Sequence, residues 1–372
     1  MDKIITSLGL MSGTSLDGID ASIIKSDGNS HLEILLNKFF PYSHDFKQKL
    51  GNYINNIYSL KDIENSKSEY KELEREITLY HSQISNEIIS EQNISLDIVG
   101  FHGQTIIHKP SEKYTIQMGD PNLLSQILKK KVIFNFRKND IENNGEGAPL
   151  APIYHSLIAK KIYPNKPSIF LNIGGITNYT YCDGDNLRAK DIGPGNVLID
   201  EYLKKTKNLE FDLDGNIASQ GKVNMDIINQ FIEHEIYNSK NRHSYDRSEF
   251  DFNFVKGLEF EDAVSTLNYF TALIISNFLN ENFDENTNII LCGGGRKNKT
   301  LSKNIKNLTK KNVVNIDEFN FDGDFIESQA FAYLAIRSFF KKISHFHKQQ
   351  RLKNQLLVEK YSRTFSKVLF LF

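Results

Sequence analysis

The stretch GLMSGTSLDGID at residues 9–20 decides the fold that we predict for this chain. Apolar and β-branched residues predict one strand over residues 3–10 and another over residues 19–25, with a small, polar turn between them. A glycine-rich turn that joins two strands is a hairpin, and it differs from the strand-to-helix step of a dinucleotide-binding loop. Because a further strand is predicted over residues 32–40, the chain opens as β-structure.

The turn of this hairpin has the composition of a phosphate-binding loop. Glycines and hydroxyl residues in a tight turn expose backbone N–H groups that can surround phosphate oxygens. The residues that we expect to act in this way are Gly13, Thr14, Ser15, Leu16, Asp17, Gly18, Ile19 and Asp20. Asp17 or Asp20 could hold Mg²⁺ through water, since Mg²⁺ prefers one or two carboxylates together with phosphate oxygens. The alternative interpretation is a plain hairpin turn that uses glycine and serine for their dihedral freedom.

The second half of the chain repeats this pattern. A buried strand is predicted over residues 168–173, and the turn Gly174-Gly175 leads to its hairpin partner over residues 176–182, which contains the polar Asn178. The predicted strand at residues 288–292 is followed by three glycines, which would let a flat ring approach the backbone closely. Helices are predicted near residues 66–90, 196–205, 262–279 and 324–340. Strands that alternate with helices indicate an α/β protein.

Length and composition exclude several classes of protein. The 372 residues imply two or three domains, and the 40% of hydrophobic residues can form large cores. With 45 Lys and Arg against 46 Asp and Glu, the charge is too balanced for a nucleic-acid partner. Two distant cysteines argue against a disulfide scaffold and a zinc module. No apolar run suits a signal peptide or a membrane span, so we expect a cytoplasmic protein with no membrane partner.

Taken in order, these motifs resemble those of the actin, Hsp70 and sugar-kinase superfamily, in which two similar lobes close on ATP. Within it, the chain resembles the anhydro-N-acetylmuramic acid kinase family over about residues 3–340. The stretches that carry the resemblance are residues 9–20, 101–105 (FHGQT), 117–120 (QMGD), 135–137 (NFR), 147–152 (GAPLAP), 171–178 (LNIGGITN), 191–196 (DIGPGN) with Asp200, 292–298 (CGGGRKN) and 327–335.

The resemblance implies an α/β fold of two actin-like (ribonuclease H-like) lobes, with mixed sheets flanked by helices and an ATP cleft between the lobes. We expect the first lobe at residues 1–130 and the second at residues 131–340, with a last helix that is able to return to the first lobe. Residues 341–372 form an atypical tail that is unrelated to the usual end of the family.

The resemblance also implies an unusual reaction. The family opens the 1,6-anhydro bond of 1,6-anhydro-N-acetylmuramic acid with water and phosphorylates O6 in the same event, with ATP and Mg²⁺. The product is N-acetylmuramic acid 6-phosphate, formed in peptidoglycan recycling. The implied contacts to ATP are the turn at residues 13–20, then Gly174, Gly175, Asn178, Gly293, Gly294 and Gly295. The partner is thus a small-molecule sugar, and the resemblance suggests a homodimer.

Asp191 is the residue that we expect to activate the water. It matches the family's catalytic aspartate, ends a predicted short strand and precedes Gly193-Pro194-Gly195. The alternative is a capping role for the helix that starts near Asn196, but five residues are too many for a direct N-cap. Glu327 matches a family glutamate that would orient the water or support Asp191. The alternative interpretation of Glu327 is a solvated residue near the start of the last helix, without a role in the reaction.

Five residues are expected to bind the sugar. Gln104 and Thr105 follow a buried strand and could bond to sugar hydroxyls or the N-acetyl group, whereas His102 beside them has a structural role as its alternative. Arg137 suits the lactyl carboxylate, because a guanidinium binds carboxylates in bidentate fashion; a surface salt bridge is its alternative. Asn196, in the stretch that holds Asp191, completes the set.

The chain departs from the family pattern near Arg137. Asn135 replaces the usual Asp, Asn143-Asn144 replaces a small or glycine pair, and Glu146 replaces Gln, so the orientation of Arg137 or the preferred sugar substituent could differ. Two alternative functions therefore stay open at this point. One is an ordinary sugar kinase that phosphorylates a free hydroxyl, and the other is an inactive or sugar-sensing homologue.

Overall fold

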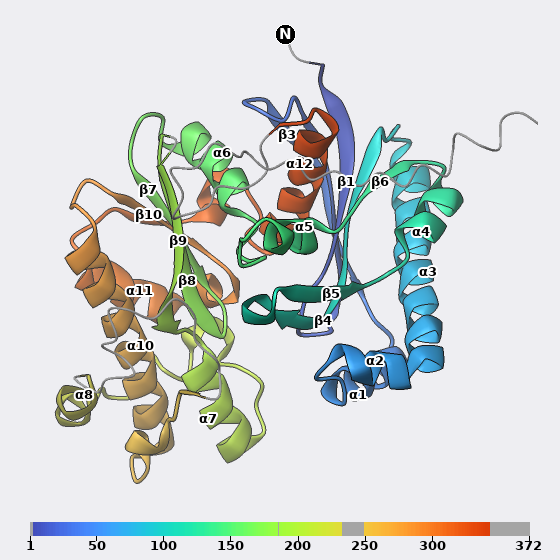
Figure 1. The fold of residues 1–372 in the computed structure, drawn as a ribbon. Helices are drawn as coiled ribbons and strands as arrows, with labels where there is room; N and C mark the ends of the chain where they lie inside the picture. Colours follow the sequence, from blue (N-terminus) through green and yellow to red (C-terminus); the bar gives the residue numbers. More distant parts are fainter. Residues whose placement is uncertain (1–2, 185, 233–248, 343–372) are drawn as a thin grey trace, which may run out of the picture. The chain divides into compact units, whose positions relative to one another are not determined.

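A computed structural model describes residues 3–184, 186–232 and 249–342 of the chain (Figure 1). It divides into two compact units, Met1–Leu157 with Phe325–Phe372, and Ile158–Asp324. This division differs from the expected boundary at residue 130, because strand β6 (Lys131–Ile133) pairs with a strand of the first unit. It also places the last helix in the first unit. The predicted tail lies outside the described residues from residue 343 onward.

The first unit contains a mixed sheet in the order β3-β2-β1-β4-β5, with β6 paired to β4. The antiparallel strands β1, β2 and β3 form the predicted opening hairpin and its continuation, and β4 runs parallel to both β1 and β6. The bounds are β1 Ile5–Ser12, β2 Gly18–Ser26, β3 Leu32–Pro41, β4 Ile98–Lys109 and β5 Tyr114–Met118.

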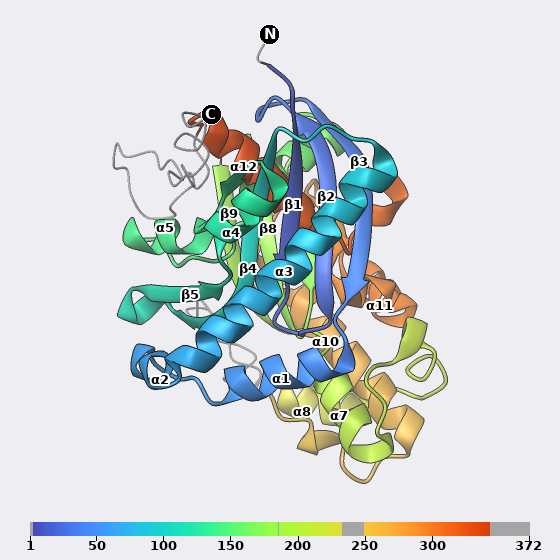
Figure 2. The ribbon, with the colours of Figure 1, turned by 90° about the vertical axis from the view of Figure 1, so that its right-hand side faces the viewer.

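Helices cover both faces of this sheet. Apolar side chains of α1 (His44–Asn55), α3 (Lys67–Gln92) and α4 (Pro121–Leu128) build a core on one face with Leu8 and Leu10. Figure 2 looks onto this face, with α3 lying across the sheet. The unit also contains α2 (Leu60–Asn65), α5 (Phe136–Glu142) and α12 (Ile326–Phe339), and the division between the units falls within α6 (Pro152–Ile162).

Helix α12 packs directly on the strands β1, β2 and β4. Its close approach depends on two glycines, because a methyl group at Gly9 would overlap the carbonyl oxygen of Ser328, and one at Gly100 would overlap that of Phe331. Gly9 alternates with Leu8 and Leu10 along β1, so β1 sends large side chains to the core and leaves only hydrogen toward α12.

The second unit repeats the topology of the first. Its sheet has the order β11-β10-β7-β8-β9, in which β7, β8 and β9 are antiparallel and β10 runs parallel to β7 and β11. The bounds are β7 Ser168–Ile173, β8 Ile176–Asp183, β9 Asn186–Pro194, β10 Asn288–Cys292 and β11 Val313–Asn315. Two α/β units, each with a mixed sheet of this order flanked by helices, confirm the predicted fold class.

The helices of the second unit fill two hydrophobic cores, and α10 contributes to both. Their bounds are α7 Val197–Lys207, α8 Met225–Phe231, α10 Phe260–Asn282 and α11 Lys299–Leu308. The glycine triplet leads into the short 3₁₀ helix Gly294–Lys297 before α11 begins.

Strand β6 ends at Ile133, because Asn135 adopts a left-handed backbone with φ of 61° and Phe136 already starts α5. One predicted strand has different limits. The strand predicted before Asp191 continues through it to Pro194, since pairing with β8 extends that far.

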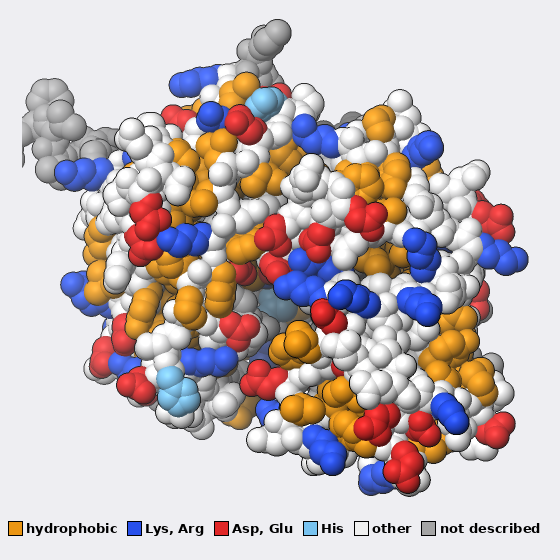
Figure 3. All heavy atoms as spheres, turned by 180° about the vertical axis from the view of Figure 1, so that it is seen from behind, with side chains coloured by type: hydrophobic (Ala, Val, Ile, Leu, Met, Phe, Trp, Pro, Cys, Tyr) orange, Lys and Arg blue, Asp and Glu red, His pale blue; other side chains and the backbone are white. Residues whose placement is uncertain are grey.

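The surface in Figure 3 carries basic and acidic side chains interspersed over the described residues of that face. No helix within the described ranges is sufficiently long and apolar to cross a membrane.

Candidate active site

The predicted phosphate turn of the first unit joins β1 to β2 and is anchored from several sides. The Gly13 carbonyl accepts hydrogen bonds from the Leu16 N–H at 3.3 Å and from Gln104 Nε2 at 3.1 Å. Leu16 has a φ of 57°, which turns the chain sharply. Thr14 and Ser15 at the tip of the turn are exposed, so their hydroxyl groups can meet a ligand. The turn therefore has the fixed backbone that phosphate binding requires.

The remaining residues of this stretch differ in their access to solvent. Gly18, Ile19 and Asp20 belong to β2, and the Ile19 side chain is fully buried in the core, so only its backbone could meet a ligand. The Asp17 carboxylate is half exposed and accepts a bond from Lys47 Nζ at 3.1 Å.

The carboxylates of this stretch fit a magnesium ion that is also held by phosphate. Among the residues that the structure describes, no group of three or more His, Cys, Asp or Glu side chains forms a metal site by itself. Asp17 and Asp20 offer two carboxylates, and Mg²⁺ uses one or two carboxylates when phosphate oxygens and water complete its shell.

The first unit brings together three predicted residues of the sugar and catalytic sets: His102, Arg137 and Glu327. Arg137 Nε donates to His102 Nε2 at 2.8 Å, and Arg137 Nη1 donates to the Gly147 carbonyl at 2.9 Å. Since His102 Nε2 accepts, His102 Nδ1 carries the proton and donates to the Gly103 carbonyl at 2.6 Å. His102 is thus a neutral support that orients the guanidinium.

Electrostatics around Arg137 agree with this arrangement. Burial and the adjacent Arg137 charge hold the pKa of His102 well below its ordinary value, so His102 stays neutral. Burial lowers the pKa of Arg137, and the nearby charges of Glu327 and Asp140 oppose that effect. Asp140 also accepts from the Gly147 N–H at 2.7 Å, so the segment that follows α5 is fixed next to the guanidinium.

Gln104 and Thr105, which we expect to bind the sugar, are neighbouring residues of β4. The Gln104 side chain is fully buried, with its Nε2 bound to the phosphate turn, and its Oε1 has no hydrogen-bond partner among the described residues. Thr105 is half-buried, and its Oγ1 accepts from Gln117 Nε2 at 3.4 Å. In this structure Gln104 therefore joins β4 to the phosphate turn.

Asp191 lies in the second unit on β9, opposite Asn178 of β8. Thr177 pairs with Gly193 and Asn178 with Asp191, so Ile192 is an extra residue that bulges the strand. The Asp191 side chain is half-buried. The residue at the N-cap position of α7 is Asn196, so Asp191 is not the N-cap residue of this helix.

The predicted glycine turns of the second unit meet at the start of α7. The carbonyls of Gly174 and Gly175 accept bonds from the backbone N–H groups of Asn196 and Gly195, each at 2.8 Å. A methyl group at Gly295 would overlap Ile173 and lie 3.0 Å from Asn196 Oδ1. The second unit thus gathers both glycine turns, Asn196 and the strand end of β7 in one place.

The glycine triplet itself has one open position. Gly293 has a φ of 76°, and a methyl group there would overlap Asn172 Oδ1. Gly294 is exposed, and a methyl group there would meet nothing within 4 Å. Two of the glycines are therefore needed for packing, and the third leaves bare backbone at the surface where a flat ring could lie.

Sequence reasoning missed Arg296, the residue that fixes this triplet. Its side chain is only 2% exposed, donates from Nη1 to the Gly293 carbonyl at 3.1 Å and forms ion pairs with Asp317 at 2.9 Å and Asp324 at 2.7 Å. Burial works to lower the pKa of Arg296, but the bonds to Asp324 and Asp317 outweigh it and raise the pKa. The sequence signal was the group of aspartates within residues 317–324. No local pattern indicates that their partner is Arg296.

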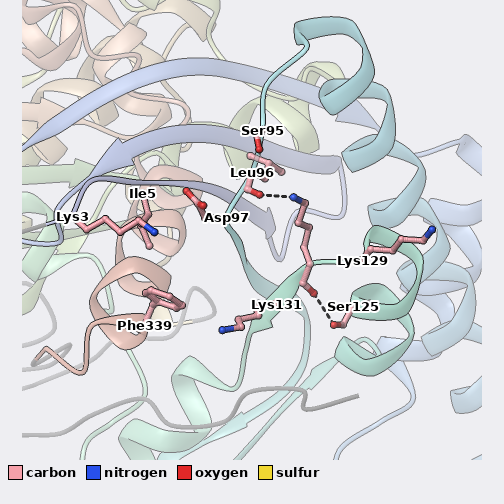
Figure 4. Close-up of a pocket in the computed structure, with 10 residues that line it drawn as sticks. Lys3, Ile5, Ser95, Leu96, Asp97, Ser125, Lys129, Lys131 and Phe339 are labelled. Atoms are coloured by element: carbon pink, nitrogen blue, oxygen red, sulfur yellow. Dashed lines mark hydrogen bonds between the residues drawn. The ribbon is translucent and has the colours of Figure 1, made fainter. Parts of the chain in front are cut away.

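A hollow on the first unit does not belong to this site. Figure 4 shows its lining, which includes none of the predicted site residues: Lys3, Ile5, Ser95, Leu96, Asp97, Ser125, Lys129, Lys130, Lys131 and Phe339. Lys130 Nζ donates to the Leu96 carbonyl at 2.6 Å, and Lys131 Nζ lies 5.2 Å from the centre of the Phe339 ring. These two charges therefore already have partners within the unit.

The repeated sheet order, with a glycine-turn hairpin at the start of each unit, defines an actin-like (ribonuclease H-like) protein. The model of the family described as anhydro-N-acetylmuramic acid kinase matches residues 5–349. The chain belongs to the anhydro-N-acetylmuramic acid kinase family.

Named relatives agree with this family over nearly their whole length. An anhydro-N-acetylmuramic acid kinase from Pelagibacter ubique is 48% identical over 364 residues, which cover 95% of this chain and 97% of the relative. Enzymes of the same name from Zymomonas mobilis and Brucella canis are 36% and 34% identical, over 92% and 91% of this chain and 95% and 93% of their own. A solved activator of 2-hydroxyisocaproyl-CoA dehydratase from Clostridium difficile covers 89% of this chain and 94% of its own at 12% identity, but its TM-score of 0.43 is too low to bear on function.

Proposed function

We propose that this chain is an ATP-dependent kinase that converts 1,6-anhydro-N-acetylmuramic acid into N-acetylmuramic acid 6-phosphate, with hydrolytic cleavage of the anhydro ring, in the recycling of peptidoglycan. The observation that carries the proposal is the family match over residues 5–349, together with a relative of that name that is 48% identical over 95% of the chain. The phosphate turn and the glycine triplet supply features that ATP binding needs.

In the proposed reaction, Asp191 accepts a proton from water as the water oxygen bonds to the anomeric carbon. The bond between that carbon and O6 breaks, and O6 takes its electron pair to the γ-phosphorus of ATP, so that ADP leaves. A carboxylate is suited to this task because a general base must be ionised at the working pH. The bulge at Ile192 supports the assignment, since bulges next to active sites often re-aim a neighbouring side chain.

The other site residues would bind and orient the reactants. The turn at residues 13–17 would hold the phosphates through its backbone N–H groups, and Gly294 would lie against the adenine ring. Mg²⁺, held through water by Asp17 or Asp20, would neutralise phosphate charge. Arg137, supported by His102, would bind the lactyl carboxylate through the N–H groups that its contacts to His102 and Gly147 leave. Glu327, close enough to Arg137 to affect its pKa, would orient the water or support the base.

We further propose a cytoplasmic homodimer that binds no nucleic acid. Only two cysteines occur, Cys182 and Cys292, far apart in the sequence, and this low cysteine content suits a reducing compartment. The interspersed charges of Figure 3 and the near balance of 45 basic against 46 acidic residues support the absence of a polyanion partner. The homodimer follows from the family resemblance, and sedimentation of the purified chain tests it.

The decisive experiment supplies Mg²⁺-ATP and the 1,6-anhydro sugar to the purified protein in ¹⁸O-enriched water, followed by mass spectrometry with fragmentation. The expected product is a phosphosugar that carries the heavy oxygen at the anomeric carbon. An unlabelled phosphosugar that keeps its anhydro ring would identify an ordinary sugar kinase instead. ATP binding without any product would identify an inactive or sugar-sensing homologue.

A further inference from the structure

Three buried polar side chains beside the phosphate turn form a hydrogen-bonded chain that the reaction does not use directly. Ser12 is the last residue of β1, Tyr42 lies just before α1, and His81 lies within α3. Ser12 Oγ lies 3.0 Å from the Tyr42 hydroxyl and 3.1 Å from His81 Nε2. The exposed fractions of the three residues are 1%, 7% and 0%, so water cannot replace these partners.

The contact between His81 and the Ile77 carbonyl determines which atom is the donor in each of these hydrogen bonds. His81 Nδ1 lies 2.8 Å from the Ile77 carbonyl, which can only accept, so Nδ1 carries the proton and Nε2 is the acceptor. The Ser12 hydroxyl must therefore donate to His81 Nε2, and the Tyr42 hydroxyl donates to Ser12 Oγ. Burial lowers the pKa of His81 to about 4, so the neutral form persists at neutral pH.

Tyr42 holds the turn at both of its ends. Its hydroxyl binds Ser12, which directly precedes Gly13, and its backbone N–H donates to the Asp17 carbonyl at 2.9 Å. The turn at residues 13–17 is thus held at one end by His81 and Tyr42 and at the other end by Tyr42. Because these contacts come from α3 and from the start of α1, they fix the turn relative to the helices of the same unit.

We propose that Tyr42 and His81 are positioning residues that hold the turn at residues 13–17, through Ser12, in the conformation that binds the phosphates of ATP. This inference rests on the proposed role of the turn in phosphate binding. A turn that is already ordered loses less conformational entropy when the phosphates bind, so its backbone N–H groups bind more tightly and align the γ-phosphate better. A cluster that only stabilised the fold would have no such effect on nucleotide binding.

Two variants break these contacts, and a third serves as a matched control: Ser12→Ala removes both bonds of the Ser12 hydroxyl, and Tyr42→Phe removes only the bond between Tyr42 and Ser12. Ser85→Ala also deletes a fully buried hydroxyl on α3, one that donates to the His81 carbonyl at 2.7 Å and does not touch the turn. We expect Ser12→Ala and Tyr42→Phe to raise the KM for ATP about tenfold, which corresponds to about 1.4 kcal/mol, and to change the KM for the sugar less than about twofold. Ser85→Ala should lower the melting temperature about as much as Ser12→Ala and Tyr42→Phe do. It should leave the KM for ATP and the KM for the sugar unchanged.

Substitutions at His81 test whether the turn needs an acceptor for the Ser12 hydroxyl at this position. His81→Gln retains an amide oxygen that can accept from Ser12, whereas His81→Leu retains the bulk and loses the acceptor. The KM for ATP should rise in His81→Leu and recover largely in His81→Gln. If the Ser12, His81 and Ser85 variants show the same KM for ATP at matched melting temperatures, the cluster is purely structural and the inference is wrong.

Calorimetric binding of ATP with Mg²⁺ separates this inference from the proposed function. If the unsubstituted protein binds ATP but forms no phosphosugar, the proposed reaction fails, while the comparison of Ser12→Ala with Ser85→Ala still tests the positioning role through their dissociation constants for ATP. If both variants bind ATP as tightly as the unsubstituted protein, the positioning role fails even when turnover is normal.

Discussion

At the scale of single residues, the candidate site consists of reactive groups and of the side chains that support them. Asp191 lies beside a strand bulge, and Arg137 is held by a neutral histidine. In each case the local sequence predicts the reactive residue, but the contact that supports it comes from a strand elsewhere in the chain. His102, for example, lies 35 residues before the guanidinium that it orients.

Asp191→Asn should abolish turnover without loss of binding. Removal of a general base costs about 10²–10⁴-fold in rate, because water must then attack without proton acceptance. We expect kcat to fall by that factor while the calorimetric affinities for ATP and for the sugar change little. Asp183→Asn, an exposed carboxylate on the neighbouring β8, is the control and should retain full turnover. Normal turnover in Asp191→Asn would remove it from the role of base.

Arg137→Lys should weaken the binding of the sugar that carries a lactyl carboxylate. A lysine cannot reproduce the planar fork, and hydrogen bonds to a charged group contribute about 1.5–3 kcal/mol, so the KM should rise about tenfold or more. Activity on 1,6-anhydro-N-acetylglucosamine, which lacks the lactyl group, should change much less. Lys138→Gln, which removes the exposed neighbour paired with Glu142, provides the control. Equal losses on both sugars would contradict the assignment.

At the scale of elements, two units use the same combination of a hairpin turn and a parallel strand. In both, glycine serves two purposes: it lets elements approach closely, as at Gly9 and Gly295, and it leaves backbone bare, as at Gly294. The sequence shows that glycines cluster after strands. It does not show which glycine allows close packing and which one leaves the backbone exposed. They differ only in what a side chain at that position would touch.

The paired variants Gly294→Ala and Gly295→Ala should separate packing from ligand contact. A methyl group at Gly295 overlaps Ile173, and overpacking costs about 1–3 kcal/mol, so the melting temperature should fall. A methyl group at Gly294 meets open space, so stability should stay unchanged while the KM for ATP rises because the base can no longer lie on the backbone. Thermal scans and initial-rate kinetics measure both. An unchanged KM in Gly294→Ala would place the adenine ring elsewhere.

At the scale of the whole molecule, burial of neutral histidines links stability to pH. Burial lowers the pKa of His81 to about 4 and that of His155 to about 3, and burial with the Arg137 charge holds the pKa of His102 well below 6.5. In the unfolded chain each would take up a proton near its ordinary value of 6.5. As pH falls below that value, the unfolded state gains protons that the folded state does not bind, and stability decreases.

We therefore expect the free energy of unfolding to fall steadily from about pH 6.5 to about pH 5, by up to about 2 kcal/mol per buried histidine. Denaturant titrations across this range measure the slope. His155→Gln should reduce the slope, because it removes one of these buried groups. A stability that is independent of pH in this range would contradict the neutral, buried state of these histidines.

Much of the fold and part of the site could be predicted from sequence. The strands, the glycine turns between them and the long helices were recognised because hydrophobic period and turn composition are local signals. The predicted strand end before Asp191 was wrong, and the compact units divide the chain elsewhere than at residue 130, because strand pairing with distant partners sets those limits. Arg296 and His81 were missed because their partners lie at residues 317–324 and at Ser12, far from them along the chain.

Local sequence patterns were sufficient to predict an α/β protein with two glycine-turn hairpins, and the motifs were sufficient to predict the family. The packing of α12 against Gly9 and Gly100, more than 200 residues earlier, and the hydrogen bond from Gln104 to the Gly13 carbonyl depend instead on the tertiary structure. A turn, or the hydrophobic periodicity of a helix or strand, depends on residues that are neighbours in the sequence. Burial and hydrogen-bond partners depend on which distant segments meet in the folded chain.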